Sequence, residues 1–283
     1  IRMTLLIIPN TTKPRARTVT AQAVRILRSA GANVILAIGS DVETLPGVRY
    51  LPKDQAFTDC DVVITIGGDG TILHTAKDCL EYDKPILGIN LGRMGFLATC
   101  EVNEMQAKLT RLAKGQFQCD KRMLLNAIVD DDVSNAQTAL NDVVIYKGHR
   151  LQTIDFNIYC DAILVNHCSG DGVIISTPTG STAYSLSAGG PILDAHIEGI
   201  VVSMICAHSL HQPSMVFAAD RCIRIEVNAK GRNEIFISTD GEEERSLRDG
   251  GHVEVELSRQ SIRLVTFSLA DQFDAIDRKL RGR

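Results

Sequence analysis

The sequence predicts an α/β protein in two parts, an N-terminal α/β domain built on a parallel sheet and a β-rich C-terminal domain. The length of 283 residues is about twice that of a typical single domain. Over the first hundred residues, short apolar runs alternate with amphipathic stretches, which is typical of α/β folds. After about residue 120 the apolar runs are short and turn residues separate them, which indicates β-rich structure.

In the N-terminal part, the strands are continuous apolar runs, predicted at 5–8, 33–38, 61–66 and 85–90. Pro14 opens a helix whose apolar residues recur at helical spacing until Gly31. A second helix is predicted over 72–80. Because strands that are apolar throughout are buried on both faces, we expect a parallel sheet with helices on each side.

In the C-terminal part, short strands are predicted at 142–146, 153–159, 223–227, 234–238, 253–257 and 262–267. A linking helix over 102–114 precedes them, and the apolar spacing of Phe273, Ile276 and Leu280 predicts a closing helix. We therefore place the α/β domain at 1–98, the β-rich domain at 99–267 and the closing helix within 268–283.

The composition argues against several classes of function. A net charge of −4, from 30 basic and 34 acidic residues, gives no basic excess for binding nucleic acid. No apolar run approaches the roughly 18 residues that span a bilayer, so we expect no membrane association. The eight cysteines form no C-x-x-C pair and no secretory leader is visible, which predicts reduced thiols in the cytoplasm.

Residues 67–71, Gly-Gly-Asp-Gly-Thr, connect a predicted buried strand to a helix. Glycines let a ligand approach the backbone closely, and N–H groups at a helix start favour an anion. Asp69 in such a turn would repel phosphates unless it accepts a proton or holds Mg²⁺; the alternative is a helix N-cap. No Gly-Lys pair exists for a P-loop, and Leu73 replaces the third glycine of the dinucleotide fingerprint.

A second motif runs from Asp171 to Pro191 and is rich in hydroxyl and small side chains. An apolar strand leads into a Ser/Thr/Gly loop, which offers backbone N–H and hydroxyl donors without bulk and suits nucleotide recognition. The alternative is an ordinary solvated loop. Cys206, His208 and His211 have a spacing that fits no common zinc site, so no protein-held metal is predicted.

With segments 92–97 and 140–144, these two motifs resemble the NAD kinases over about residues 5–280. The pentapeptide alone is shared with phosphofructokinases and with lipid kinases, whereas the 171–191 run is far more specific. The resemblance implies phosphoryl transfer from ATP to the 2′-hydroxyl of the adenosine ribose of NAD, giving NADP. It also implies Mg²⁺ or another divalent cation with ATP, a homodimer or homotetramer, and a final helix that returns to the first domain.

The resemblance also implies roles for individual residues. Asp69 matches the catalytic base, and Gly67, Gly68, Gly70 and Thr71 match the turn that lines the ATP phosphates. Asp240 matches a carboxylate near the active site. The positions that match NAD-binding residues are Asp69, Gly70, Phe96, Asn141, Asp142, Asp171, Thr179, Thr182, Ala183, Tyr184 and Ser187.

The chain departs from the family pattern at three places. Asp142 stands where Glu is usual, Ser169 stands where some members carry Arg, and the segment after the first strand has Lys13 alone instead of two lysines. Two other functions remain open: a lipid kinase of the same superfamily, which the hydroxyl-rich loop disfavours, and a non-catalytic dinucleotide sensor, which would need no base. A further hypothesis places the apolar stretch within 199–217 at a subunit interface.

Overall fold

The computed structural model describes residues 2–92, 95–149, 152–209, 211–229, 234–242 and 244–268, together with Phe273, Ile276 and Asp277. The chain forms two compact units. Unit 1 comprises 1–121 and 262–283, and unit 2 comprises 122–261. Among the described residues, no helix is long and apolar enough to cross a membrane.

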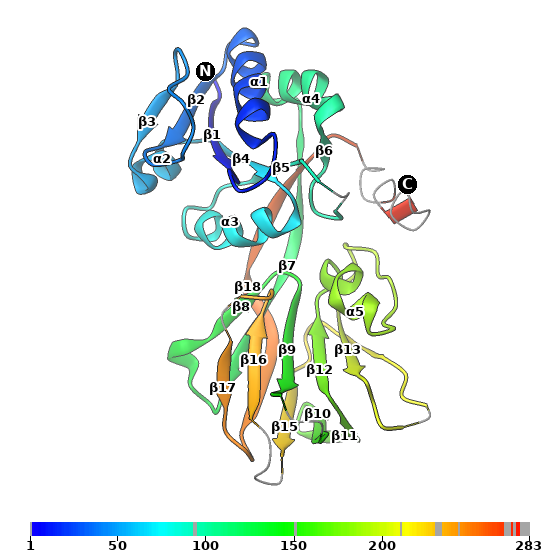
Figure 1. The fold of residues 1–283 in the computed structure, drawn as a ribbon. Coiled ribbons are helices and arrows are strands. Elements are labelled where there is room, and N and C mark those ends of the chain that lie inside the picture. The colour runs from blue at the N-terminus through cyan, green and yellow to red at the C-terminus, as the bar shows by residue number, and fades with distance from the viewer. Residues whose placement is uncertain are drawn as a thin grey trace. The chain divides into compact units, whose positions relative to one another are not determined.

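Unit 1 is built on a parallel sheet in the order β18-β5-β4-β1-β2-β3, with β6 also paired to β5 (Figure 1). The strands are β1 (Thr4–Pro9), β2 (Asn33–Ala37), β3 (Arg49–Leu51), β4 (Val62–Gly67), β5 (Ile86–Asn90), β6 (Cys100–Glu101) and β18 (His252–Thr266). The parallel sheet predicted from the apolar runs is confirmed.

The helices of unit 1 are α1 (Ala16–Ser29), α2 (Lys53–Asp59), α3 (Asp69–Glu81) and α4 (Met105–Ala113), and η1 (Val102–Glu104) leads into α4. Helix α1 buries Val19, Ala23 and Leu27 in the same apolar cluster as the strands. Helix α4 adds Met105, Leu109 and Leu112 to that cluster. The predicted boundary at residue 99 puts this helix in the second domain, but its apolar face packs into unit 1.

Unit 2 consists of two antiparallel sheets with a shared core. One sheet has the order β14-β13-β12-β9-β16-β17. Its strands are β9 (Asp142–Lys147), β12 (Gly172–Ser176), β13 (Gly199–Ile205), β14 (Met215–Ala218), β16 (Ile235–Thr239) and β17 (Arg245–Leu247). The other is the antiparallel part of the 12-stranded sheet that also includes the strands of unit 1. It contains β7 (Gln118–Val129), β8 (Gln137–Ala139), β10 (Ile154–Cys160), β11 (Ile163–Gly170), β15 (Ile223–Asn228) and the first part of β18. Short helices η2 (Val133–Asn135), η3 (Gly180–Thr182) and α5 (Tyr184–Ser187) complete the described elements.

One apolar cluster takes side chains from both sheets of unit 2. Val143 and Ile145 of β9 join it from one sheet, and Phe156 and Ile158 of β10 join it from the other. Alternate residues of each strand point to opposite faces of a sheet. The second face of the six-stranded sheet is therefore available for other contacts.

Three expectations for the C-terminal half need correction. The strands predicted at 253–257 and 262–267 are one continuous strand, β18, because the polar residues between them contain no glycine or proline to break it. The last element described is this strand and not a helix; the predicted closing helix over 268–283 lies almost wholly outside the described residues. The stretch proposed as an interface forms β13, where Ile200, Val202 and Met204 belong to the core.

Candidate active site

The Gly-Gly-Asp-Gly-Thr turn lies where β4 ends and α3 begins. A Cβ atom on Gly67 would lie 2.1 Å from Oγ1 of Thr71, so only glycine fits there. The Thr71 hydroxyl in turn accepts a hydrogen bond of 3.3 Å from Nδ2 of Asn10, which follows β1. The turn is thereby fixed against the carboxyl end of the neighbouring strand. Gly70 is exposed, and a Cβ atom there would meet nothing within 4 Å.

The Asp69 carboxylate accepts three consecutive backbone N–H groups. Oδ2 accepts from Phe96 at 2.7 Å, and Oδ1 accepts from Leu97 at 3.1 Å and Ala98 at 3.2 Å. A Cβ atom on Gly95 would lie 1.9 Å from Oδ1, so this glycine makes room for the carboxylate. The N-cap of α3 is Gly68, and the Asp69 side chain makes no cap hydrogen bond, which argues against the helix-cap alternative.

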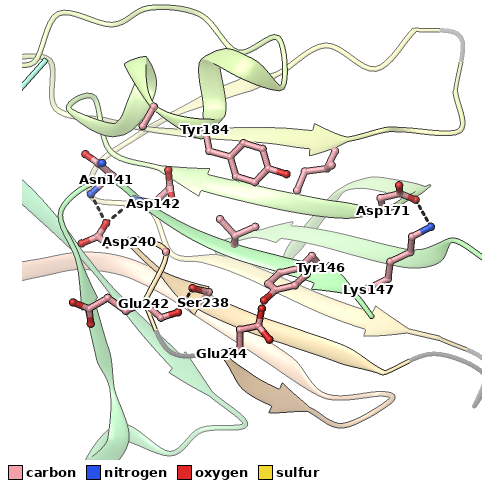
Figure 2. Close-up of a pocket in the computed structure, with 14 residues that line it drawn as sticks. Asn141, Asp142, Tyr146, Lys147, Asp171, Tyr184, Ser238, Asp240, Glu242 and Glu244 are labelled. Atoms are coloured by element: carbon pink, nitrogen blue, oxygen red, sulfur yellow. Dashed lines mark hydrogen bonds and ion pairs between the residues drawn. The ribbon is translucent and has the colours of Figure 1, made fainter. Parts of the chain in front are cut away.

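Unit 2 contains a cavity of about 650 Å³ on the face of the six-stranded sheet away from the core (Figure 2). Alternate residues of β9, namely Asp142, Val144 and Tyr146, line it, and the intervening Val143 and Ile145 face the core. The predicted site residues that line the cavity are Asn141, Asp142, Asp171, Ala183, Tyr184 and Asp240. Thr179, Thr182 and Ser187 are not among its lining residues. Phe96 and the residues of the glycine turn belong to unit 1.

Asp240 organises one end of this cavity in the same way as Asp69 organises its loop. Its carboxylate accepts the backbone N–H group of Leu140 at 2.7 Å. It also accepts those of Asn141 at 2.7 Å and Asp142 at 3.2 Å (Figure 2). Its own N–H donates to the Asp142 carbonyl at 2.9 Å. Asp240 has a φ of 54°, a left-handed conformation that Asp tolerates better than most residues. Asp240 therefore fixes the backbone at the beginning of β9, where Asn141 and Asp142 lie.

Asp142 is a buried carboxyl group in the cavity wall, 5% exposed. Its pKa is raised to about 7, chiefly by burial and also by the nearby Asp240 charge, while a hydrogen bond from the Tyr184 backbone acts in the opposite direction. The pKa of Asp240 is also raised, chiefly by burial. Such perturbed carboxyl groups in a cavity are typical of functional sites.

Residues that the sequence analysis missed supply much of the polar wall. Lys147 forms an ion pair of 2.7 Å with Asp171 (Figure 2). Tyr146 faces Glu244, and burial together with a hydrogen bond to that carboxylate raises the pKa of Tyr146 to about 12. Two-residue alternation along 142–146 was the available signal for Tyr146, because it shares the face of Asp142.

Four hydroxyls of the 176–187 loop donate to backbone carbonyls of the protein, those of Ser176, Thr177, Ser181 and Thr182. The Thr177 hydroxyl donates to the Leu140 carbonyl at 2.6 Å, and the Ser181 hydroxyl donates to the Pro178 carbonyl at 2.6 Å. Within the described part of the chain, Thr179 Oγ1 is buried and has no hydrogen-bond partner. A Cβ atom on Gly180 would lie 2.0 Å from the Asn141 carbonyl oxygen, so the loop packs directly against the residue that opens β9.

Comparison with protein families matches both units. Residues 5–117 match the ATP-NAD kinase N-terminal domain, and residues 140–267 match the ATP-NAD kinase C-terminal domain. A NAD kinase of Natranaerobius thermophilus is 34% identical over 285 residues, covering 98% of this chain and 97% of the relative. The chain belongs to the ATP-NAD kinase family. A NAD kinase of Thermoanaerobacter sp. is similar at 35% identity, with 98% of each chain covered.

Solved structures agree with this membership. The structure of yeast NADH kinase complexed with NADH has a TM-score of 0.85 at 25% identity, covering 99% of this chain and 87% of the other. An NAD kinase from Archaeoglobus fulgidus in complex with ATP shares the fold, with a TM-score of 0.73 at 22% identity over all of both chains. The family activity is phosphorylation of NAD to NADP with ATP. This enzymatic activity decides against the lipid-kinase and sensor alternatives.

Proposed function

We propose that Asp69 is the base that accepts the proton of the 2′-hydroxyl of the adenosine ribose during phosphoryl transfer. An ionised carboxylate has about four lone-pair sites. Among the described residues, Oδ1 of Asp69 accepts from Leu97 and Ala98, whereas Oδ2 accepts from Phe96 alone. The remaining site on Oδ2 supports the proposal, because it leaves an acceptor for the hydroxyl while the other bonds fix the carboxylate's orientation.

The cavity of unit 2 is proposed to hold the dinucleotide. Asn141 and Asp142 would bind ribose hydroxyls, since both are held in the wall by the Asp240 contacts. Tyr184, which is 46% exposed, offers a ring face for stacking, and Ala183 beside it leaves room. The remaining NAD contacts are assigned from the family motif alone, to Gly70, Phe96, Asp171, Thr179, Thr182 and Ser187. Of these, Thr179 has a buried hydroxyl oxygen with no hydrogen-bond partner among the described residues, and a ligand would supply that partner.

The glycine turn of Gly67, Gly68, Gly70 and Thr71 is proposed to line the ATP phosphates, although the N–H of Thr71 itself donates to the Gly68 carbonyl at 2.9 Å. The first turn of α3 leaves N–H groups without partners within the helix, and anions bind at such ends. Mg²⁺ or another divalent cation would neutralise charge on the triphosphate. Asp69 already accepts three N–H groups, so its carboxylate is not needed as a ligand of the cation. The cation would instead be bound by the ATP phosphates and by water, as is usual for Mg²⁺.

A direct assay tests this function on the full chain. The purified protein is incubated with ATP, Mg²⁺ and NAD, and NADP is measured enzymatically. Parallel reactions replace NAD by diacylglycerol, replace NAD by NADH, or omit Mg²⁺. We expect NADP to form only with ATP, NAD and divalent cation together. Phosphorylation of the lipid instead, or NAD binding without turnover, would contradict the proposal. The NADH arm shows whether this chain accepts the ligand named in the yeast structure.

The proposed setting is a homodimer or homotetramer in the cytoplasm. The eight cysteines are free thiols, as expected for a reducing compartment. Strand β11 lies at the edge of its sheet and exposes Ile163, Leu164 and Val165 by 68%, 52% and 41%. Natural proteins rarely leave an apolar sheet edge uncovered. This edge therefore replaces β13 as our proposed subunit contact.

A further inference from the structure

A small basic cavity lies in unit 1 at the amino ends of the parallel strands, whereas the Gly-Gly-Asp-Gly-Thr turn follows the carboxyl end of a strand. Strands β1, β2, β3 and β4 are parallel, so their amino ends lie on one side of the sheet and their carboxyl ends, with the turn after β4, lie on the other. Arg2 precedes β1, Arg49 opens β3, and Arg28 comes from the last turn of α1. Together they line a cavity of about 190 Å³.

The cavity carries positive charge that the protein neutralises only in part. Among the described residues that line it, none is acidic. Arg49 forms an ion pair of 2.8 Å with Asp59. Arg28 donates to the Pro46 carbonyl at 2.5 Å, and a carbonyl carries no formal charge. Arg2 is exposed, and no described carboxylate contacts it. Two of the three guanidinium charges thus have no carboxylate partner among the described residues.

Contacts with Pro46 and Gly47 place the guanidinium of Arg28. A Cβ atom on Gly47 would lie 2.0 Å from Cζ of Arg28, so the guanidinium of this exposed residue occupies the space that a side chain at position 47 would fill. Gly47 also has a φ of +72°, which favours glycine. A guanidinium that is already held in place loses less conformational entropy when it binds a ligand.

We propose that this cavity binds a small multivalent phosphate anion, either inorganic phosphate or diphosphate. Guanidinium groups recognise phosphate oxygens through paired N–H donors. The volume is below the roughly 300 Å³ at which cavities hold drug-sized ligands, so a whole nucleotide does not fit. Neither anion is a substrate or product of the NAD kinase reaction. The site is therefore separate from the glycine turn and from the unit 2 cavity.

NMR of the ¹⁵N-labelled full chain tests the proposal. Phosphate and then diphosphate are titrated at constant ionic strength, with NaCl as the reference titration. We expect saturable shifts of the Gly31, Val34 and Gly47 amides with one or both phosphate anions and none with NaCl. Shifts of equal size with NaCl, or shifts confined to residues 67–71, would overturn the proposal.

Variants show whether the arginines carry the binding. Arg28→Gln should weaken the affinity at least tenfold. Arg2→Gln should weaken it as well, and because Arg2 is exposed this change should not affect folding. The matched control is Arg25→Gln, which removes an exposed arginine of the same helix that does not line the cavity. An affinity that is unchanged in both the Arg28 and Arg2 variants, or that falls equally in the Arg25 variant, would refute the assignment.

Discussion

Two aspartates have the same structural arrangement at the scale of single residues. Asp69 in unit 1 and Asp240 in unit 2 each accept three consecutive backbone N–H groups. Hydrogen bonds to a charged acceptor are stronger than those between neutral groups. Each carboxylate therefore fixes a loop that carries predicted site residues, which are Phe96 in one unit and the Asn141–Asp142 pair in the other.

Asp240→Asn should impair NAD binding more than turnover. The amide can present its oxygen to only one side, so its NH₂ group would face a backbone N–H of residues 140–142. We expect the KM for NAD to rise roughly tenfold, which corresponds to about 1.4 kcal/mol, within the ~1–3 kcal/mol that a lost buried hydrogen bond costs. Glu244→Gln is the control, since it removes a charge from the same cavity. An equal rise of KM in both variants would indicate charge rather than positioning.

Asp142→Asn should stabilise the protein at alkaline pH. The pKa of Asp142 is about 7 in the folded protein and about 3.9 for an unperturbed Asp, so the folded state binds more protons between these values. The free energy of unfolding therefore falls as pH rises from about 4 to 7. Asn has no such penalty, so the variant's advantage should grow over this range and then level off. Urea unfolding of both proteins at pH 4.5, 6, 7 and 8.5 measures it. A stability difference independent of pH would contradict the assigned pKa.

At the scale of elements, the loop between β12 and α5 must pack tightly on the start of β9. Gly180→Ala would place a methyl group against the Asn141 carbonyl, and neither backbone can yield easily. We expect a loss of about 1–3 kcal/mol in stability, typical of overpacking, and weaker NAD binding. Gly92→Ala is the control, because a Cβ atom there meets nothing within 4 Å. Calorimetry of both variants, with and without NAD, makes the comparison. Wild-type behaviour of Gly180→Ala would mean that the loop is less closely packed.

The sequence predicts the elements that have strong periodicity better than their long-range contacts. Strand β4 and helix α3 are apparent from an apolar run and the glycine turn that follows it. The three-residue strand β3 is too short to give a pattern. The Asp69 contact with 96–98 and the Asp240 contact with 140–142 join residues about 30 and 100 positions apart, so only the folded chain reveals them. The sequence predicts the hydroxyl-rich loop, but it does not reveal that several of these hydroxyls donate to backbone carbonyls in the loop and at residues 140–141.

At the scale of the whole molecule, the exposed apolar edge of β11 predicts self-association. Light scattering at micromolar concentration should give a mass that is two or four times 30.9 kDa. Leu164→Lys should shift the mass toward one chain, because a buried lysine at a sheet edge opposes pairing. The control is Val216→Lys, another exposed apolar residue on the edge strand of the other sheet. A wild-type mass of one chain would refute the oligomer, and an unchanged mass for the Leu164 variant would exclude this edge.

The role of Asp69 as the base is tested most directly by kcat for NADP formation, measured for Asp69→Asn and for Gly95→Ala. Both variants disturb the contact between the carboxylate and the 95–98 loop, but only the first removes the proton acceptor. The account predicts a loss of about 10²–10⁴-fold in kcat for Asp69→Asn, typical of losing a general base. Gly95→Ala should lower kcat as well, because its methyl group would lie 1.9 Å from Oδ1 of Asp69 and displace the same carboxylate, while NAD affinity is largely kept in both variants across a Mg²⁺ series. Near-wild-type kcat in Asp69→Asn, or recovery of its activity at high Mg²⁺, would contradict the assignment of Asp69 as the base.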